Sequence, residues 1–225
     1  MNLLEECKGA KRIGISGHIR PDGDCVGACM GLYLYLTKKI PDIQIQLFLE
    51  KPADVFGCIA RIGEVDSSYG EQERFDVFFA LDAVPDRLGE AERYYREAHK
   101  KVNIDHHISN KGNCGDVNYV FPKASSTSEL IYRLIGAKEL DQDIAQALYI
   151  GIIHDTGVFR YSNTSPDTLR AAADLISYGF DFNKLIDETF YEKTYLQTQI
   201  LGRALLESIL FMHGRSVVSV LDRKT

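Results

Sequence analysis

Four segments of the sequence place acidic and histidine side chains directly after apolar runs. The acids and histidines concerned are His18, Asp22, Asp24, Asp82, Asp105, His106, His107 and Asp155. Carboxylate oxygens with a minority of imidazoles suit Mn²⁺, Mg²⁺ or Co²⁺, whereas a structural zinc site would ask for thiolates. Two such ions roughly 3.5–4 Å apart can activate water and hold both oxygens of a phosphoryl displacement. The segments therefore predict a two-metal site for phosphate ester hydrolysis.

Each segment also has a simpler interpretation, because an Asp after a strand is commonly a cap or a turn former. Four such coincidences in one chain favour a shared site. The charges agree with two ions: Asp22, Asp24, Asp82 and Asp155 bring four negative charges, and two divalent cations bring four positive ones. One of these carboxylates can bridge both ions.

Short apolar runs alternate with helix-period segments, which predicts an α/β fold with a parallel sheet flanked by helices. The expected strands are 12–16, 43–49, 76–81 and 101–104. The expected helices are 25–39, 87–100, 127–135, 142–153 and 166–178, with a capping box between Ser126 and Glu129. Ligands collect at the carboxyl ends of strands in open parallel sheets. The four segments are therefore expected in one crevice.

The last part of the sequence differs from this alternating pattern. Residues 195–212 read as one long helix, and 216–221 (SVVSVL) read as a strand without a partner. We expect one domain over 1–190, and over 191–225 a linker helix with the front edge of a second domain whose remainder is absent.

Composition narrows the class of protein. The 225 residues are 45% hydrophobic and 26% charged, which is ordinary for a globular protein, and the net charge of -6 excludes a duplex-coating protein. Five cysteines without a CxxC pair favour a reduced, intracellular protein in which they are small core residues. The N-terminus is unlike a signal peptide and no apolar run suits a membrane helix, so we expect a cytoplasmic protein.

Four motifs in this order resemble the DHH phosphoesterase family over about residues 2–190. They are GHIRPDGDCVGA (17–28), ALDA (80–83), IDHH (104–107) and HDTGVFRYSNTS (154–165). The segment ASSTSELIYRL (124–134) resembles the branch with bacterial nano-RNases, which also dephosphorylate 3'-phosphoadenosine 5'-phosphate. Family members of this branch carry a C-terminal domain with a glycine-rich substrate motif, which this sequence lacks.

The resemblance implies roles for individual residues. His18 and Asp22 would hold one ion, Asp24, His106 and Asp155 the other, and Asp82 would bridge the two. Manganese is the expected metal, with magnesium or cobalt as alternatives. Asp105 would orient a neighbouring histidine, and His107 would face the scissile phosphate.

Further residues are candidates for substrate contacts. Arg160 and Arg20 can bind phosphate through their guanidinium groups, although solvated surface arginines explain them equally well. Ser125, Ser126 and Thr127 can offer hydroxyls and helix N-terminal amides to a phosphate, and helix capping explains them equally. His154, beside a proposed ligand, is expected to pack structurally.

The predicted function is metal-dependent hydrolysis of short single-stranded oligonucleotides or 3'-phosphoadenosine 5'-phosphate, by a protein that can form a homodimer. Two enzymatic alternatives stay open, a cyclic-dinucleotide phosphodiesterase and an inorganic pyrophosphatase. An alternative of another class is a noncatalytic module that binds metal or nucleotide, which would show binding without turnover.

Overall fold

The computed structural model describes residues 3–71, 73–207, 209–212 and 215–218. The chain divides into two compact units, Met1–Thr189 and Phe190–Thr225. The first unit contains a five-stranded parallel sheet with the strand order β2-β1-β3-β4-β5. Its strands are β1 (Arg12–Ser16), β2 (Gln44–Phe48), β3 (Val77–Leu81), β4 (Lys100–Asp105) and β5 (Val117–Val120). The predicted α/β fold with a parallel sheet is thus confirmed.

Helices cover both faces of this sheet. The α-helices of the first unit are α1 (Leu3–Glu6), α2 (Gly23–Lys39), α3 (Glu92–Glu97), α4 (Thr127–Ile135), α5 (Gln142–Asp155), α6 (Pro166–Ile176) and α7 (Phe182–Ile186). Short 3-10 turns lie at Asp54–Cys58, Ile62–Glu64, Pro85–Arg87, Gly89–Ala91 and Ala137–Glu139, and a π-helical turn spans Asp187–Tyr191.

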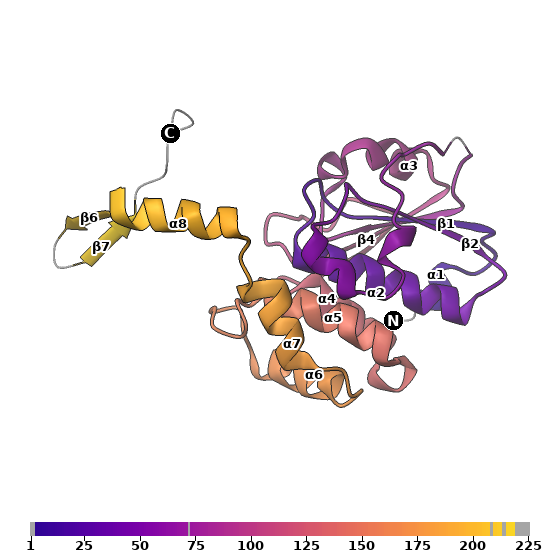
Figure 1. Ribbon diagram of the computed structural model, residues 1–225. Helices are drawn as coiled ribbons and strands as arrows, with labels where there is room; N and C mark the ends of the chain where they lie inside the picture. The colour runs from indigo at the N-terminus through magenta and orange to yellow at the C-terminus, as the bar shows by residue number, and fades with distance from the viewer. Residues whose placement is uncertain (1–2, 72, 208, 213–214, 219–225) are drawn as a thin grey trace. The chain divides into compact units, whose positions relative to one another are not determined.

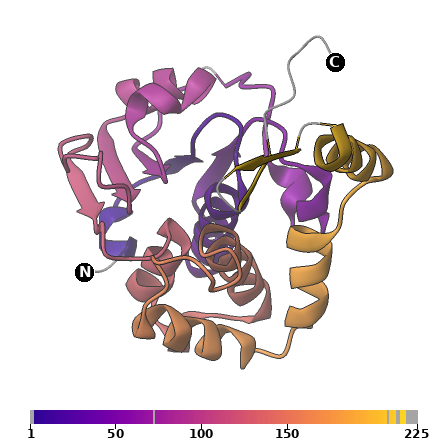
Figure 2. The same ribbon diagram turned by 90° about the vertical axis from the view of Figure 1, so that its left-hand side faces the viewer.

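The first unit is layered, with α3 on one face of the sheet and α2 and α4 on the other (Figure 1). The view turned by 90° shows the same grouping, with α5 against α2 (Figure 2). Two separate cores follow from this layering. A smaller aromatic core under α3 includes Phe48, Phe78 and Tyr95, and a larger aliphatic core lies between the sheet and α2, α4 and α5.

Glycines set the spacing of the helices beneath the sheet. A Cβ atom on Gly27 would lie 2.6 Å from the carbonyl oxygen of Ala147 and 2.9 Å from the Cα of Gly151. A Cβ on Gly151 would in turn lie 1.9 Å from Ser128 Oγ and 3.0 Å from Asp24 Oδ1. Helices α2 and α5 therefore meet through their backbones at this point, and the Ser128 side chain of α4 packs against Gly151, which brings the polar ends of all three helices together.

The strand order reverses direction at β1. Strand β2 lies on one side of β1, and β3, β4 and β5 follow on the other. In such sheets the connections after the two central strands diverge and leave a crevice at their carboxyl ends. Here the loop that begins with Gly17 and His18 follows β1, and Asp82 follows β3.

The segment expected to form the helix 87–100 differs from that expectation. Two 3-10 turns precede a short helix, α3, and Lys100 already belongs to β4. Pro85 begins the first turn, and Gly89 adopts a φ of 57°, where its missing Cβ avoids a 2.5 Å contact with Ile19. The left-handed φ of Gly89 is incompatible with a continuous helix over 87–100. Helices α1 and α7 and strand β5 are additional to the predicted elements.

The second unit contains α8 (Tyr195–Glu207), β6 (Ile209–Met212) and β7 (Arg215–Val218). The prediction of one helix over 195–212 is therefore wrong at its end, where the β-type run ILFM forms a strand. The prediction of an unpaired strand over 216–221 is also wrong, because β6 and β7 pair antiparallel, and residues 219–221 lie outside the described residues. That this unit begins a second domain stays a prediction.

The burial of the cysteines and the apolar length of the helices bear on two of the predictions made from composition. Cys7, Cys25 and Cys29 are buried as expected, whereas Cys58 is exposed and Cys114 is half-buried, so the core interpretation holds for three of the five. Helices long and apolar enough to cross a bilayer are absent from the described residues.

Candidate metal centre

The loop after β1 contributes the first two proposed ligands. The Nε2 atom of His18 lies 3.6 Å from Asp22 Oδ1 and 3.4 Å from Asp82 Oδ2. The Nδ1 atom of His18 lies 2.8 Å from the carbonyl oxygen of Ile19, which leaves Nε2 turned toward the carboxylates. Asp22 caps α2, since its Oδ1 accepts hydrogen bonds from the backbone N–H groups of Asp24 and Cys25. The short loop is thereby held against the start of the helix.

Asp82 lies at the centre of the cluster. It follows β3 with a left-handed φ of 55°, a conformation that costs energy for a non-glycine residue and turns its side chain into the crevice. Its Oδ1 lies 3.6 Å from His106 Nε2 and 3.4 Å from His107 Nδ1, while its Oδ2 faces His18. The side chain is buried and contacts residues from both halves of the cluster, as a bridging ligand would.

Asp24 is held by the N-terminus of α4. Its Oδ2 accepts a hydrogen bond of 2.7 Å from the backbone N–H of Thr127, and its Oδ1 accepts one of 2.9 Å from Ser128. The hydroxyl of Thr127 donates to Asp82 Oδ1 at 3.0 Å. Thr127 therefore fixes two carboxylates from different elements, Asp24 in the first turn of α2 and Asp82 directly after β3.

His106 and Asp155 complete the second group. The Nε2 atom of His106 lies 3.5 Å from Asp155 Oδ2 and 3.9 Å from Asp24 Oδ2. Asp155 is the last residue of α5, and its position depends on the close crossing of α5 with α2 described above. The three side chains thus come from a helix start, a strand end and a helix end.

His107 lies on the open side of the cluster and is bound to Asp105. Its Nδ1 lies 2.7 Å from Asp105 Oδ1, and its backbone N–H donates to the same oxygen. The other oxygen, Oδ2, accepts from the amide of Asn110, which also donates to Asn103 Oδ1. Asp105 is buried, whereas the His107 side chain is 42% exposed. His107 is thus a fixed histidine whose far edge faces solvent.

The electrostatics of the cluster show a surplus of negative charge. Although burial opposes it, contact with Asp22 and Asp82 raises the pKa of His18 to about 11. Burial alone would raise the pKa of Asp22, but His18 and the hydrogen bonds from the backbone N–H groups at the start of α2 lower it to about 2. Burial and repulsion by neighbouring carboxylates raise the pKa of Asp24 well above its usual range, and burial raises that of Asp155 to about 6.

These side chains form three overlapping groups in which one ligand atom of each residue lies within 4.8 Å of the others. The groups are His18 with Asp22 and Asp82, Asp24 with His106 and Asp155, and Asp82 with His106 and His107. The donor set of carboxylates and imidazoles fits Mn²⁺, Mg²⁺ or Co²⁺. Divalent cations would also offset the repulsion among the buried carboxylates. The residues present therefore fit two ions.

The serines and threonine proposed as substrate contacts are buried. Ser126 Oγ accepts a hydrogen bond from the backbone N–H of Glu129 and caps α4. Only this half of the expected capping box forms, because the Glu129 carboxylate instead accepts from the backbone N–H and hydroxyl of Ser125. Together with Thr127 these residues position carboxylates and a helix end in this structure.

The two arginines proposed as phosphate contacts are exposed. Among the described residues, neither Arg160 nor Arg20 makes a side-chain hydrogen bond or ion pair, so both guanidinium groups are accessible. Arg20 has a left-handed φ of 53°, and its backbone N–H donates to Glu50. Their role in phosphate binding stays a prediction.

His154 packs beneath the metal loop, as expected. A Cβ atom on Gly23 would lie 2.2 Å from the Cγ of His154, so the imidazole lies against the glycine backbone. Its Nε2 is 3.2 Å from Thr189 Oγ1, and the Phe56 ring lies beside it. Burial lowers the pKa of His154, which favours the neutral ring.

Several polar residues around the cluster were not predicted from the sequence. Asn110 holds Asp105, Glu129 holds the loop before α4, and Asn163 contacts Asp155. The signal for Glu129 was present, since a capping box was expected there, but its partner is Ser125. Asn163 lies within the motif HDTGVFRYSNTS, whereas Asn110 lies beyond the motif IDHH.

Comparisons with known proteins show which family of proteins this chain matches. The model of the family described as "DHH family, N-terminal domain" matches residues 12–152. Over 181 residues the chain is 33% identical to the bifunctional oligoribonuclease and PAP phosphatase NrnA of Bacillus subtilis, covering 78% of this chain and 56% of that protein. The NrnA of Thermus thermophilus is 29% identical over 213 residues, covering 92% of this chain and 62% of that protein. The chain thus spans less than two thirds of either relative's length.

The fold also has a counterpart among solved structures. An exopolyphosphatase-related protein from Bacteroides fragilis matches with a TM-score of 0.82 at 24% identity, covering 91% of this chain and 63% of that chain. The family match extends from β1 into α5 and so includes the strands and helices that carry most of the clustered side chains. This chain belongs to the DHH family.

Proposed function

We propose that this chain is a metal-dependent phosphoesterase that hydrolyses short oligonucleotides and 3'-phosphoadenosine 5'-phosphate. The observation that carries the proposal is the position of Asp82, whose two oxygens face separate groups of ligand atoms at the point where the strand order reverses. The names of the relatives, oligoribonuclease and PAP phosphatase, support the class of substrate.

In this proposal His18 and Asp22 would hold one ion, Asp24, His106 and Asp155 would hold the other, and Asp82 would be shared between them. When bound, two divalent cations would lower the pKa of the attacking water and offset the charge of the phosphate. The protein supplies the fixed carboxylates, which do not need to reorganise because backbone N–H groups and Thr127 already orient them.

His107 has the geometry of a proton donor to the leaving oxygen. Its hydrogen bond to Asp105 raises its pKa, so the imidazole keeps a second proton more readily than a free histidine. Because Asp105 lies at Nδ1, the proton at Nε2 is the one that can move. Hydrolysis adds water across the phosphorus–oxygen ester bond, and the leaving oxygen takes up this proton. Arg160 and Arg20 are proposed to hold phosphate oxygens.

A panel of substrates tests the proposal. The chain is assayed with dinucleotides, longer oligonucleotides, 3'-phosphoadenosine 5'-phosphate, cyclic dinucleotides and pyrophosphate, each with Mn²⁺ and with Mg²⁺. An Asp82→Asn preparation, purified identically, reports any contaminating phosphatase. We expect metal-dependent release of mononucleotides from dinucleotides, or of phosphate from 3'-phosphoadenosine 5'-phosphate.

Other outcomes of this panel would replace the proposal. Selective cleavage of cyclic dinucleotides or of pyrophosphate would assign the chain to one of those activities. Tight binding of metal and nucleotide with no turnover of any compound would identify a binding module.

A further inference from the structure

Asn163 connects two segments that carry proposed ligands or their supports. It lies in the turn after α5, and its side-chain amide donates hydrogen bonds to the carbonyl oxygens of Ser125 and Asp155 at 2.9 and 3.0 Å. The same Nδ2 atom lies 3.4 Å from Asp155 Oδ2. One amide group therefore contacts both the main chain and the carboxylate of Asp155.

The orientation of this amide is determined by its surroundings. All three atoms facing Nδ2 are acceptors, so the amide oxygen cannot take that position. The Asn163 Oδ1 atom is buried and has no hydrogen-bond partner among the described residues. Leaving a buried acceptor unpaired costs stability. The side chain of Asn163 is therefore oriented by the three acceptors that its Nδ2 atom contacts, at the expense of its own oxygen.

The segment on the other side of Asn163 also supports ligands. Ser125 is fixed through its backbone N–H and hydroxyl by the buried carboxylate of Glu129. Thr127 and Ser128 follow directly and donate their backbone N–H groups to Asp24. Asn163 therefore ties the end of α5 to the segment that orients Asp24.

The path of the chain explains how Asn163 reaches this place. Gly157, Val158 and Phe159 all have left-handed φ values of 54° to 63°, and such a run is strained for β-branched and aromatic residues. The carbonyl oxygen of Thr156 accepts hydrogen bonds from the backbone N–H groups of Arg160 and Tyr161. This tight reversal returns the chain toward the end of α5.

We infer that Asn163 is a positioning residue that sets the group of Asp24, His106 and Asp155 for metal binding. The inference rests on the proposed metal centre and is independent of which phosphate ester is cleaved. Without the amide, the Asp155 carboxylate loses its neighbour on the side of the turn, and the turn loses its link to the segment before α4. The group of His18 and Asp22 has no contact with Asn163 and keeps its geometry.

The test compares Asn163→Ala with a matched asparagine that has no such contact. Like Asn163, Asn118 makes three side-chain hydrogen bonds, all of them to the main chain: it accepts from Cys114 and Gly115 and donates to the carbonyl oxygen of Gly115. Calorimetric titration with Mn²⁺ measures the number of bound ions and the affinity of each. Thermal unfolding of the metal-free variants reports their stability.

For Asn163→Ala we expect one of two Mn²⁺ sites to weaken by roughly 10–100-fold, as for other residues that orient ligands, while the second site is unchanged. Asn118→Ala should bind both ions as the unmodified chain does. On the best substrate of the panel, kcat should fall for Asn163→Ala with KM nearly constant. If Asn163→Ala does not fold, Asn163→Ser, whose short hydroxyl cannot span both acceptors, should show the same loss.

Unchanged affinity at both sites of Asn163→Ala, or equal loss in Asn118→Ala, would overturn the inference. A chain that binds two ions but hydrolyses nothing would overturn the proposed function alone, because the comparison is measured from bound metal. A chain that binds no Mn²⁺ would overturn both.

Discussion

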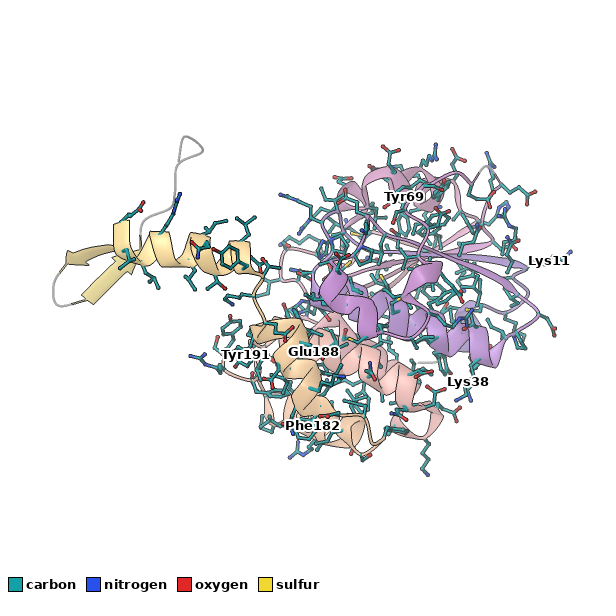
Figure 3. All side chains as sticks on the ribbon, in the orientation of Figure 1. Lys11, Lys38, Tyr69, Phe182, Glu188 and Tyr191 are labelled. Atoms are coloured by element: carbon teal, nitrogen blue, oxygen red, sulfur yellow. The ribbon has the colours of Figure 1, made fainter. Side chains whose placement is uncertain are left out.

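Two carboxylates lie at opposite ends of the strands of one sheet, which we call its amino edge and its carboxyl edge. They accept similar hydrogen bonds, yet their pKa values are shifted in opposite directions. At the amino edge, Asp76 accepts from the backbone N–H groups of Lys11 and Arg12, and these bonds lower its pKa. Lys11 marks this edge in Figure 3. At the carboxyl edge, Asp24 accepts from two N–H groups of α4, yet burial and repulsion by Asp82 raise its pKa.

Burial and neighbouring charge together explain the difference, because Asp24 is buried beside Asp82 and Asp155, whereas Asp76 is only partly buried and lies near His99 and Lys11. At the amino edge, the Arg12 guanidinium pairs with Glu71 at 2.6 Å and with Glu73 at 3.0 Å, so opposite charges lie side by side. At the carboxyl ends of the strands, the ion-pair partners of Asp22, Asp24, Asp82 and Asp155 among the described residues are histidines, without a Lys or Arg. Backbone hydrogen bonds therefore do not distinguish a structural carboxylate from a functional one. Burial beside other carboxylates, without a Lys or Arg partner among the described residues, is what sets Asp24 apart from Asp76.

The largest effect is expected at the carboxyl edge, which we call the charged edge, from Asp82→Asn. This substitution keeps the shape of the side chain and removes its charge. Because the carboxylate faces both ligand groups, we expect metal content and turnover to fall together. The loss in turnover should be at least about a thousandfold, the equivalent of several kcal/mol of lost charge stabilisation. Metal analysis and steady-state kinetics measure the two effects. Asp76→Asn is the control and should keep both, and normal turnover in Asp82→Asn would remove the bridging role.

The two adjacent histidines should separate metal binding from proton transfer. His107→Ala should keep nearly normal Mn²⁺ content and lose roughly 100- to 10,000-fold in turnover, the range for loss of a general acid or base. His106→Ala should lose metal and turnover together, since its Nε2 faces three carboxylates. Equal depletion of metal in both variants would contradict this division of roles.

Metal binding at the charged edge should release protons. His18, with a pKa of about 11, holds a proton at neutral pH that an ion must displace, and the raised pKa of Asp24 acts in the same direction. The apparent affinity for Mn²⁺ should therefore increase with pH between about 6 and 8, by up to roughly tenfold per pH unit for each proton released. Calorimetry in two buffers of different ionisation heat counts these protons. An affinity independent of pH would show that the ligands are already deprotonated.

The smallest expected effect is the change in the free energy of unfolding when one carboxylate at either edge is removed. Asp76 has a lowered pKa, so its ionised form stabilises the fold at neutral pH, and Asp76→Ala should cost about 1 kcal/mol with or without metal. Asp24 has a raised pKa, so its ionised form is disfavoured without metal, and Asp24→Ala should cost less than Asp76→Ala there.

Saturating Mn²⁺ should reverse this order. Metal at a hundredfold excess over Kd adds about 2.7 kcal/mol to the unmodified chain and to Asp76→Ala, and Asp24→Ala should lose most of that gain. Urea unfolding at pH 7 with and without Mn²⁺ measures the four values. A metal response that is the same in both variants would refute the comparison.

Much of the first unit could be predicted because its signals are local. The apolar runs of β1 to β4 differ from their surroundings within a few residues, and β1, β3 and β4 are each followed by an acid or histidine that lies in the cluster. Strand β5 escaped prediction because VNYV is short and only partly apolar. The strand ILFM of β6 was assigned to a helix because a helical pattern runs directly into it.

The supporting contacts could not be predicted because they join segments far apart in sequence. Asn163 meets Ser125 across 38 residues, and Asp24 meets Thr127 across 103. Neither contact leaves a periodic pattern in either segment. Thr127 illustrates the limit: its hydroxyl was expected to face substrate or cap the helix, and it donates to Asp82 instead.

The close crossing of α2 and α5 at their glycines makes the geometry of the cluster largely independent of the aliphatic core around it. Because Gly27 and Gly151 bring main chains into contact, the spacing of Asp24 and Asp155 does not depend on which aliphatic side chains fill the remaining core. Exchanges among Leu, Ile and Val elsewhere in α2 and α5 should therefore change the stability of the core more than the separation of the two carboxylates. A single methyl group at either glycine would instead move two helices at once, so these positions tolerate no gradual change.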